Sequence, residues 1–254
     1  GLPIRYKISA QVRTFKEQSG VLGANADTNT EGIYGLNVLL HGDGGQSFQD
    51  FPNQAVQDNL IGVAVLAPNK RRIWGGGSGL DRTDGVAHAA AVNTLIQKYL
   101  PQDLLFNSSR VFFTGVSGGS LLLSGFFIPA YGVEYKTGVV LNCGGLTPQV
   151  PIVKGAEMVS NMKIHFQSTQ NELADLRPEL PRAISAYESL ASRAGLSNAQ
   201  IGRLQTVDNT PNGGHCAFDG KDFVSGVQLI SSNYANIMGD QASGKIEGIG
   251  NVLK

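Results

Sequence analysis

Short apolar runs alternate with helix-like segments along this 254-residue sequence. Runs of four or five residues that are apolar nearly throughout predict strands covered on both faces, as in a parallel sheet. The predicted strands span residues 36–40, 63–67, 111–114, 138–141, 164–167 and 203–207. The N-terminal segment 4–15 alternates more, which indicates an antiparallel edge strand or a hairpin.

Helix-like patterns lie between these runs. The predicted helices span residues 84–100, 117–128, 179–195 and 217–239. Asp84 is a possible N-cap of the first, whose apolar stripe includes Val86, and Gly195 is a natural C-terminal residue for the third. Alternating strands and helices predict an α/β protein: a three-layer α/β/α sandwich around a mostly parallel sheet, as one domain over 1–254.

The charge balance excludes some function classes. Twenty basic residues offset twenty acidic ones, and the basic run at 69–72 is short, so binding to nucleic acid or an anionic membrane has no electrostatic support. The longest apolar stretch, 121–133, contains Ser124, Gly125 and Pro129 and is too short to span a bilayer. No metal-ligand cluster or nucleotide motif is present, so we expect no cofactor and no metal.

Three features favour secretion. The sequence begins at Gly1 rather than Met, as expected of a chain whose signal peptide has been removed. Its two cysteines, Cys143 and Cys216, fit either one disulfide in an exported protein or two unrelated buried thiols. Asn107 opens an Asn-Ser-Ser sequon, a candidate glycosylation site.

Ser117 stands in a Gly-Val-Ser-Gly-Gly motif between the predicted strand ending near Thr114 and a helix. A serine at a sharp strand-to-helix turn needs glycines two residues before and after it, because side chains there would collide with neighbouring elements. Such a turn exposes the hydroxyl and points a helix N-terminus at it. The alternative is an ordinary Gly/Ser turn. We predict that Ser117 is a nucleophile.

The segment His41-Gly-Asp-Gly-Gly follows the first predicted strand of the main sheet. A glycine-rich loop in this position leaves backbone N–H groups free to bind an oxyanion. The expected donors are the N–H of Gly118 and that of Asp43 or Gly44. His41 precedes the nucleophile in the chain, so we interpret it as a residue that braces the loop.

Of the four histidines, His215 is predicted to be the general base. It lies in a loop rich in Gly, Pro and Asn after the last predicted strand, an accessible position for a proton shuttle. His88 falls in a predicted helix and His165 in a predicted strand, which favours packed or surface roles. Cys216, next to His215, is placed to bridge to Cys143, because both follow strand ends on one side of the sheet.

The third catalytic residue should emerge after the strand at 164–167. Glu172 and Asp175 are the candidates, and Glu172 is preferred because it lies nearer the strand end, whereas Asp175 is placed to cap the next helix. Asn171 is neutral and cannot stabilise an imidazolium by charge.

With these residues in place, the sequence resembles the α/β-hydrolases over residues 34–237, on the motifs HGDGG, GVSGGS and GGHC. The first motif, the Ala-Pro-Asn and Trp of 67–74, and the His-Cys pair are similar to fungal and bacterial carboxylesterases of the feruloyl-esterase and polyester-depolymerase type. The resemblance implies Ser117 as nucleophile, His215 as base and Gly118 as an oxyanion donor. It departs at the acid, where such enzymes usually have Gly-x-x-Asp.

The sequence therefore predicts a secreted serine carboxylesterase that acts through an acyl-enzyme on a small or polymer-borne ester. Trp74 is expected to line the substrate pocket beside the glycine-rich loop 75–79, and no large lid domain is expected. Two alternatives remain. One is a serine peptidase or acyltransferase with the same triad. The other is a catalytically silent hydrolase-fold binding module, supported by Asn171 at the usual acid position.

Overall fold

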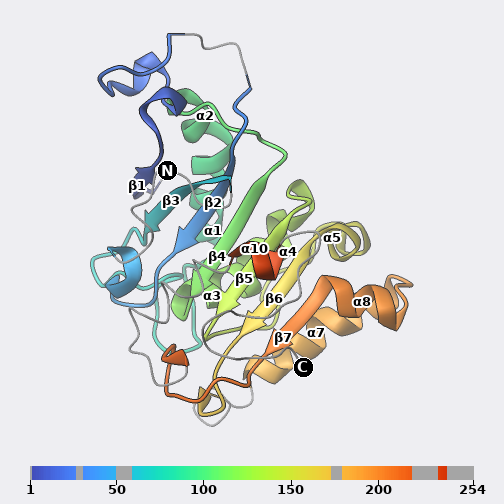
Figure 1. Ribbon diagram of the computed structural model, residues 1–254. Coiled ribbons are helices and arrows are strands. Elements are labelled where there is room, and N and C mark those ends of the chain that lie inside the picture. Colours follow the sequence, from blue (N-terminus) through green and yellow to red (C-terminus); the bar gives the residue numbers. More distant parts are fainter. Residues whose placement is uncertain (1, 27–30, 50–58, 173–178, 219–233, 239–254) are drawn as a thin grey trace.

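The computed structural model describes the chain except residues 1, 27–30, 50–58, 173–178, 219–233 and 239–254 (Figure 1). Seven strands form one sheet in the order β1-β3-β2-β4-β5-β6-β7, with β1 and β7 at opposite edges. Only β1 is antiparallel to its neighbour. The strands are β1 (Arg5–Ser9), β2 (Gly35–Leu40), β3 (Leu60–Leu66), β4 (Val111–Val116), β5 (Gly138–Asn142), β6 (Lys163–Gln167) and β7 (Gln205–Asp208).

The predicted strands are all present, and the N-terminal segment is an edge strand rather than a hairpin. Some boundaries were wrong: β3, for example, begins at Leu60 rather than at residue 63. Residues 203 and 204, predicted to begin a strand, belong to α8 (Asn198–Leu204), and the strand β7 begins at Gln205. Ser197 starts α8 with a capping box, in which its hydroxyl accepts the Gln200 N–H while the Gln200 side chain binds the Ser197 N–H. That Ser-x-x-Gln spacing was the sequence signal for this helix.

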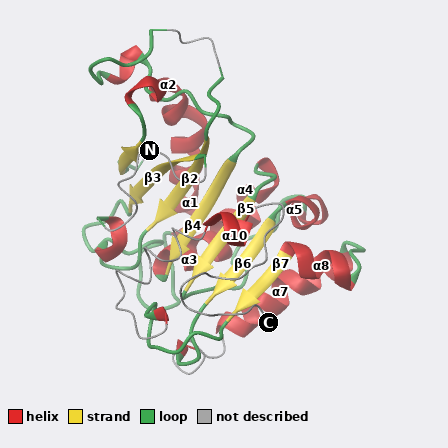
Figure 2. Ribbon diagram, viewed as in Figure 1, coloured by secondary structure: helices red, strands yellow, loops and turns green. Residues whose placement is uncertain are grey.

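Helices cover both faces of the sheet (Figure 2). Two long helical segments contain a π-helical turn: α1 (Gly85–Thr94), η4 (Leu95–Tyr99) and α2 (Leu100–Asp103) form the first, and α3 (Gly118–Leu122), η5 (Leu123–Phe127) and α4 (Ile128–Tyr131) the second. The remaining helices described are α5 (Gly155–Asn161), α7 (Glu179–Arg193), α8 and α10 (Tyr234–Met238). Short 3₁₀ turns are η1 (Val12–Thr14), η2 (Glu17–Ser19), η3 (Gln46–Phe48) and η6 (Gly132–Glu134).

The strand side chains divide between two clusters, because successive residues of a strand point to opposite faces. Val139 and Leu141 pack with the side chains of α1, α3, α5 and α7 in the main core. Val140, between them, packs with Tyr234 and Ile237 of α10 on the other face. The predicted three-layer α/β/α sandwich is therefore confirmed.

Helix details differ in part from the sequence prediction. Of the apolar stripe predicted through Val86, Ala90, Leu95, Ile96 and Leu100, the last three are buried, whereas Val86 is 61% exposed. Within α1 the buried face instead includes Ala89 and Val92. Asp84 occupies the N-cap position of α1 without a capping side-chain hydrogen bond. Gly195 does follow α7 in a left-handed conformation, at φ +87°, as predicted. Most of the predicted helix 217–239 lies outside the described residues, apart from α10.

The interval between β5 and β6 holds only α5, so no lid domain is inserted there. Among the described residues, no helix combines the length and apolar character that a membrane span needs.

Candidate active site

Ser117 lies at the turn from β4 into α3, with φ +49° and ψ −111°. This conformation is strained for a residue with a Cβ. A Cβ on Gly115 would lie 2.6 Å from the Ser120 nitrogen, and one on Gly119 would overlap the Leu40 carbonyl oxygen. Glycines two residues before and after the serine therefore allow the turn, as predicted, and Ser117 stays partly exposed at the carboxyl edge of the sheet.

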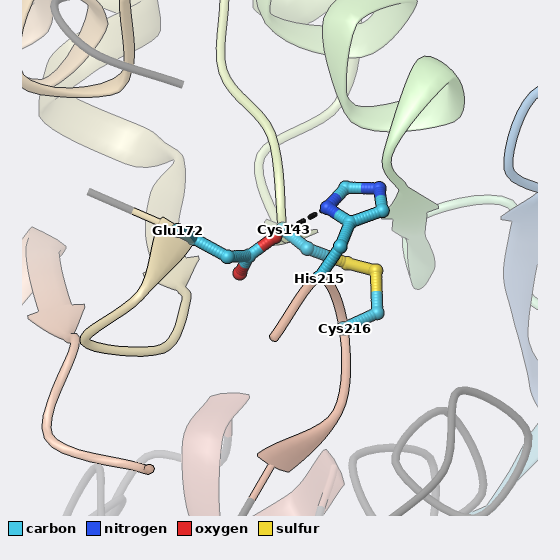
Figure 3. Close-up of side chains that lie close together, drawn as sticks. All are labelled: Cys143, Glu172, His215 and Cys216. Atoms are coloured by element: carbon cyan, nitrogen blue, oxygen red, sulfur yellow. Dashed lines mark hydrogen bonds and ion pairs between the residues drawn. A yellow bond between two sulfur atoms is a disulfide. The ribbon is translucent and has the colours of Figure 1, made fainter. Parts of the chain in front are cut away.

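The structure brings three of the predicted residues into one hydrogen-bonded chain. The Ser117 hydroxyl lies 2.9 Å from His215 Nε2, and His215 Nδ1 lies 2.5 Å from Glu172 Oε1. Glu172 accepts at Nδ1, so that nitrogen carries the proton and Nε2 can accept from the serine. Figure 3 shows the Glu172 and His215 side chains pointing toward each other. The histidine side chain is 43% exposed, whereas the carboxylate is fully buried.

Glu172 is held by the loop that follows β6. Its Oε2 accepts the backbone N–H of Thr169 at 3.2 Å, so both carboxylate oxygens have a donor. The Thr169 hydroxyl in turn donates to the Gly213 carbonyl at 2.9 Å, which links the acid loop to the histidine loop. Asp175, the other acid candidate, lies outside the described residues. Nothing in the sequence pattern identified Thr169.

Cys143 and Cys216 form a disulfide, with their Cα atoms 5.3 Å apart, so the pairing inferred from the strand ends is confirmed (Figure 3). Both half-cystines have left-handed backbones, at φ +48° and +55°. Candidate ligand atoms of these cysteines, Glu172 and His215 lie within 4.8 Å of one another. Metals bind cysteine as the thiolate, and these sulfurs are bonded to each other, so the donor set does not fit a metal centre.

Of the predicted oxyanion donors, one is occupied. The Gly44 N–H donates to the Arg72 carbonyl at 2.9 Å, so it is not free to bind an oxyanion. The Asp43 N–H makes no hydrogen bond to any described residue. Gly118 is the first residue of α3, where a helix leaves its N–H groups without partners in the helix. The amides of Gly118 and Asp43 are therefore available.

The other three histidines are buried. His41 braces its loop, since Nδ1 donates to the Gly42 carbonyl at 2.6 Å and Nε2 accepts the Ala67 N–H at 2.9 Å. Burial lowers the pKa of His41 to about 4 and that of His165 to about 4. Burial also lowers the pKa of His88, whose Nδ1 accepts the Gly75 N–H at 2.8 Å. All three are packed, as predicted for them.

Trp74 does not line the site surface. Its side chain is fully buried, with the indole ring 5.3 Å from the His41 ring and 6.0 Å from the His88 ring between centroids. Its position beside a glycine-rich loop suggested a pocket wall, but the ring is buried against the rings of His41 and His88 instead. This geometry gives no support to the predicted contact with substrate.

Two supporting residues were missed from the sequence. The Asn142 carbonyl, at the end of β5, accepts the Ser117 N–H at 2.9 Å and the Ser120 hydroxyl at 2.8 Å, and so fixes the turn. Arg82, only 2% exposed, makes a bidentate ion pair with Asp43. A lone arginine in a loop carries no sequence signal for such a role.

No protein-family profile and no curated protein matches this sequence. Solved structures do match. A thermostable esterase has 14% identity and a TM-score of 0.56, over 91% of this chain and 58% of that one. A phospholipase/carboxylesterase from Dyadobacter fermentans has 14% identity and a TM-score of 0.53, over 90% and 95% of the two chains. The Bacillus cereus carboxylesterase has 16% identity and a TM-score of 0.53, over 84% and 86%.

This chain thus spans somewhat more than half the length of the thermostable esterase and most of the other two. At such low identity the likeness shows the fold. The parallel sheet, the serine at the turn after β4 and the histidine after β7 agree with it: the chain has the α/β-hydrolase fold.

Proposed function

We propose that this protein is a serine carboxylic-ester hydrolase that acts through a Ser117–His215–Glu172 triad. The observation that carries the proposal is the continuous hydrogen-bonded chain from the Ser117 hydroxyl through the imidazole to a buried carboxylate. Esterases among the solved structures with the same fold support the ester as substrate class.

The geometry supports a two-step acyl transfer. His215 Nε2 takes the Ser117 proton as the hydroxyl attacks the ester carbonyl, and the imidazolium that forms is stabilised by Glu172. The amides of Gly118 and Asp43 bind the oxyanion of the tetrahedral intermediate. His215 then donates its proton to the leaving alcohol, and water, activated by the same nitrogen, releases the acid.

The substrate is a small or polymer-borne ester in this proposal, because the histidine side chain is 43% exposed and no lid is inserted between β5 and β6. The disulfide favours an oxidising compartment, so we also propose that the protein is secreted and that Asn107, half-buried just before the exposed turn at 108–109, is its glycosylation site.

The silent-module alternative loses its main argument, since Glu172 rather than Asn171 bonds to His215. The peptidase alternative is tested together with the esterase. Purified protein should hydrolyse a p-nitrophenyl ester and release no detectable p-nitroaniline from a peptide anilide, and a fluorophosphonate probe should label Ser117.

Ser117→Ala should abolish labelling and lower kcat by at least about 10³-fold, because the nucleophile is lost. Ser160→Ala is the matched control: that serine lies exposed on α5, and its removal should leave both signals intact. Wild-type protein that neither reacts with the probe nor cleaves the ester would refute the proposed function.

A further inference from the structure

The glycine-rich loop 75–79, which the triad does not use, lies against the buried Arg82 side chain at Gly75. Gly75, Gly76, Gly77 and Gly79 all have positive φ, between +54° and +76°. A Cβ on Gly75 would lie 2.8 Å from the Arg82 Cβ, and one on Gly77 would overlap the Asp81 carbonyl oxygen. Glycine at position 75 therefore allows the loop to lie directly against the arginine, and the positive φ of all four residues favours glycine throughout the loop.

The buried guanidinium of Arg82 binds both carboxylate oxygens of Asp43. Arg82 Nη1 donates to Asp43 Oδ1 at 3.0 Å and Nη2 to Oδ2 at 2.8 Å. Nη1 also donates to the Trp74 carbonyl at 2.9 Å, and the Trp74 N–H lies 3.3 Å from Asp43 Oδ1. The side chain of Arg82 is 2% exposed and that of Asp43 is 33% exposed. The guanidinium is therefore buried, whereas the carboxylate is partly open to solvent. A bidentate pair fixes orientation as well as distance.

The carboxylate of Asp43 lies directly against Gly118. A Cβ on Gly118 would overlap Asp43 Oδ1, so this position admits only glycine. The Gly118 amide is one of the two available oxyanion donors, and the other is the backbone amide of Asp43 itself. A negative charge beside a developing oxyanion opposes its formation unless a partner cation offsets it.

We propose that Arg82 is a positioning residue of the oxyanion hole. Its guanidinium fixes the Asp43 amide beside that of Gly118 and offsets the charge of the Asp43 carboxylate. This inference rests on the proposed function, because it requires an oxyanion to form at Ser117.

The test compares kcat and KM for a p-nitrophenyl ester among wild type, Arg82→Gln, Asp43→Asn and the double variant, with thermal melting of each. Arg82→Gln should lower kcat about 100-fold, as the loss of an oxyanion donor does, and change KM less than about 3-fold. Adding Asp43→Asn should restore kcat at least about 10-fold over Arg82→Gln, because the unpaired carboxylate is removed. Arg193→Gln, at the exposed end of α7, is the matched control.

A purely structural pair would give a different pattern, because the double variant lacks the same contact and would be no faster than Arg82→Gln. That result, or a kcat of Arg82→Gln within about 3-fold of wild type, would overturn the positioning role. If Arg82→Gln does not fold, Arg82→Lys replaces it: a fall in kcat of at least about 5-fold supports the proposal, and wild-type kcat overturns it. Inactive wild-type protein would instead refute the proposed function.

Discussion

Ser117 keeps a strained backbone with positive φ, which costs a non-glycine residue about 1–3 kcal/mol. The surrounding contacts compensate: the Asn142 carbonyl accepts both the Ser117 N–H and the Ser120 hydroxyl. Gly119 removes the side chain that would otherwise strike the Leu40 carbonyl. The position of Ser117 is therefore set by its neighbours as much as by the serine itself.

Gly119→Ala should destabilise the fold by about 1–3 kcal/mol and lower kcat, because the added methyl displaces the turn from Leu40. Gly202→Ala is the matched control. It lies in α8, where an added methyl group would meet nothing within 4 Å, so alanine there should stabilise by about 0.5–1 kcal/mol. Urea unfolding of both variants measures the difference, and equal shifts in the two would contradict the steric argument.

Glu172→Gln should lower kcat at least about 100-fold, because a neutral amide cannot stabilise the His215 imidazolium. The variant should remain folded, as a cooperative thermal melt would show. Asp175→Asn is the paired comparison and should cost less than about 10-fold, since Glu172 already bonds to Nδ1. Steady-state kinetics on an ester decides between them. A large loss in Asp175→Asn alone would reverse the acid assignment.

The pairing of β6 with β7 includes a buried histidine. His165 Nδ1 lies 2.8 Å from the Thr206 hydroxyl, and Nε2 lies 3.1 Å from Gln167 Oε1. Burial, aided by the charge of Lys163, lowers its pKa from 6.5 to about 4. The imidazole is therefore neutral in the folded protein at pH values where the unfolded chain is already protonated.

Folding should consequently weaken as the pH falls. The stability that neutral His165 contributes is complete above pH 6.5 and is lost as the pH falls toward about 4, amounting to about 2 kcal/mol between pH 7 and pH 5. Urea unfolding at the two pH values measures it. His165→Gln removes the titrating group. The unfolding free energy of this variant should therefore fall by about 2 kcal/mol less than that of wild type between pH 7 and pH 5. Identical pH dependence in the two proteins would count against the prediction.

Across the whole molecule, the disulfide joins segments that are 73 residues apart in the chain, the end of β5 and the loop after β7. It holds the histidine loop near Ser117, because Cys216 adjoins His215. The crosslink restricts the unfolded chain as well, by an amount that grows with the length of the closed loop.

Replacing both Cys143 and Cys216 by alanine should lower the unfolding free energy by about 4 kcal/mol on the chain-entropy estimate for this loop length. It should also lower kcat, because His215 is less well held. Thermal melts and ester kinetics measure the two effects, and dithiothreitol treatment of wild type should reproduce both. A reduced protein with unchanged melting and unchanged kcat would show that the crosslink is dispensable.

Local pattern was sufficient for most of the architecture and for two residues of the site. Apolar runs of strand length, alternating with helical patterns, define a parallel sheet with helices on its faces. The turn at Ser117 could be predicted from the sequence because only the glycines around it permit that turn. His215 could be predicted because it follows the last strand. The boundary near Arg203 was wrong because a capping box outweighed the apolar pattern.

Tertiary contacts decided the rest. The choice of Glu172 depends on how the loop after β6 meets the loop after β7, through Thr169 and Gly213, which are distant in sequence. Trp74 is buried because its ring packs against those of His41 and His88, and the Gly44 N–H is occupied because it donates to the Arg72 carbonyl. The sequence by itself determines conformations that depend on one residue and its neighbours in the chain. Hydrogen bonds between loops form only after the sheet has brought the ends of the strands, and so the loops that follow them, close together.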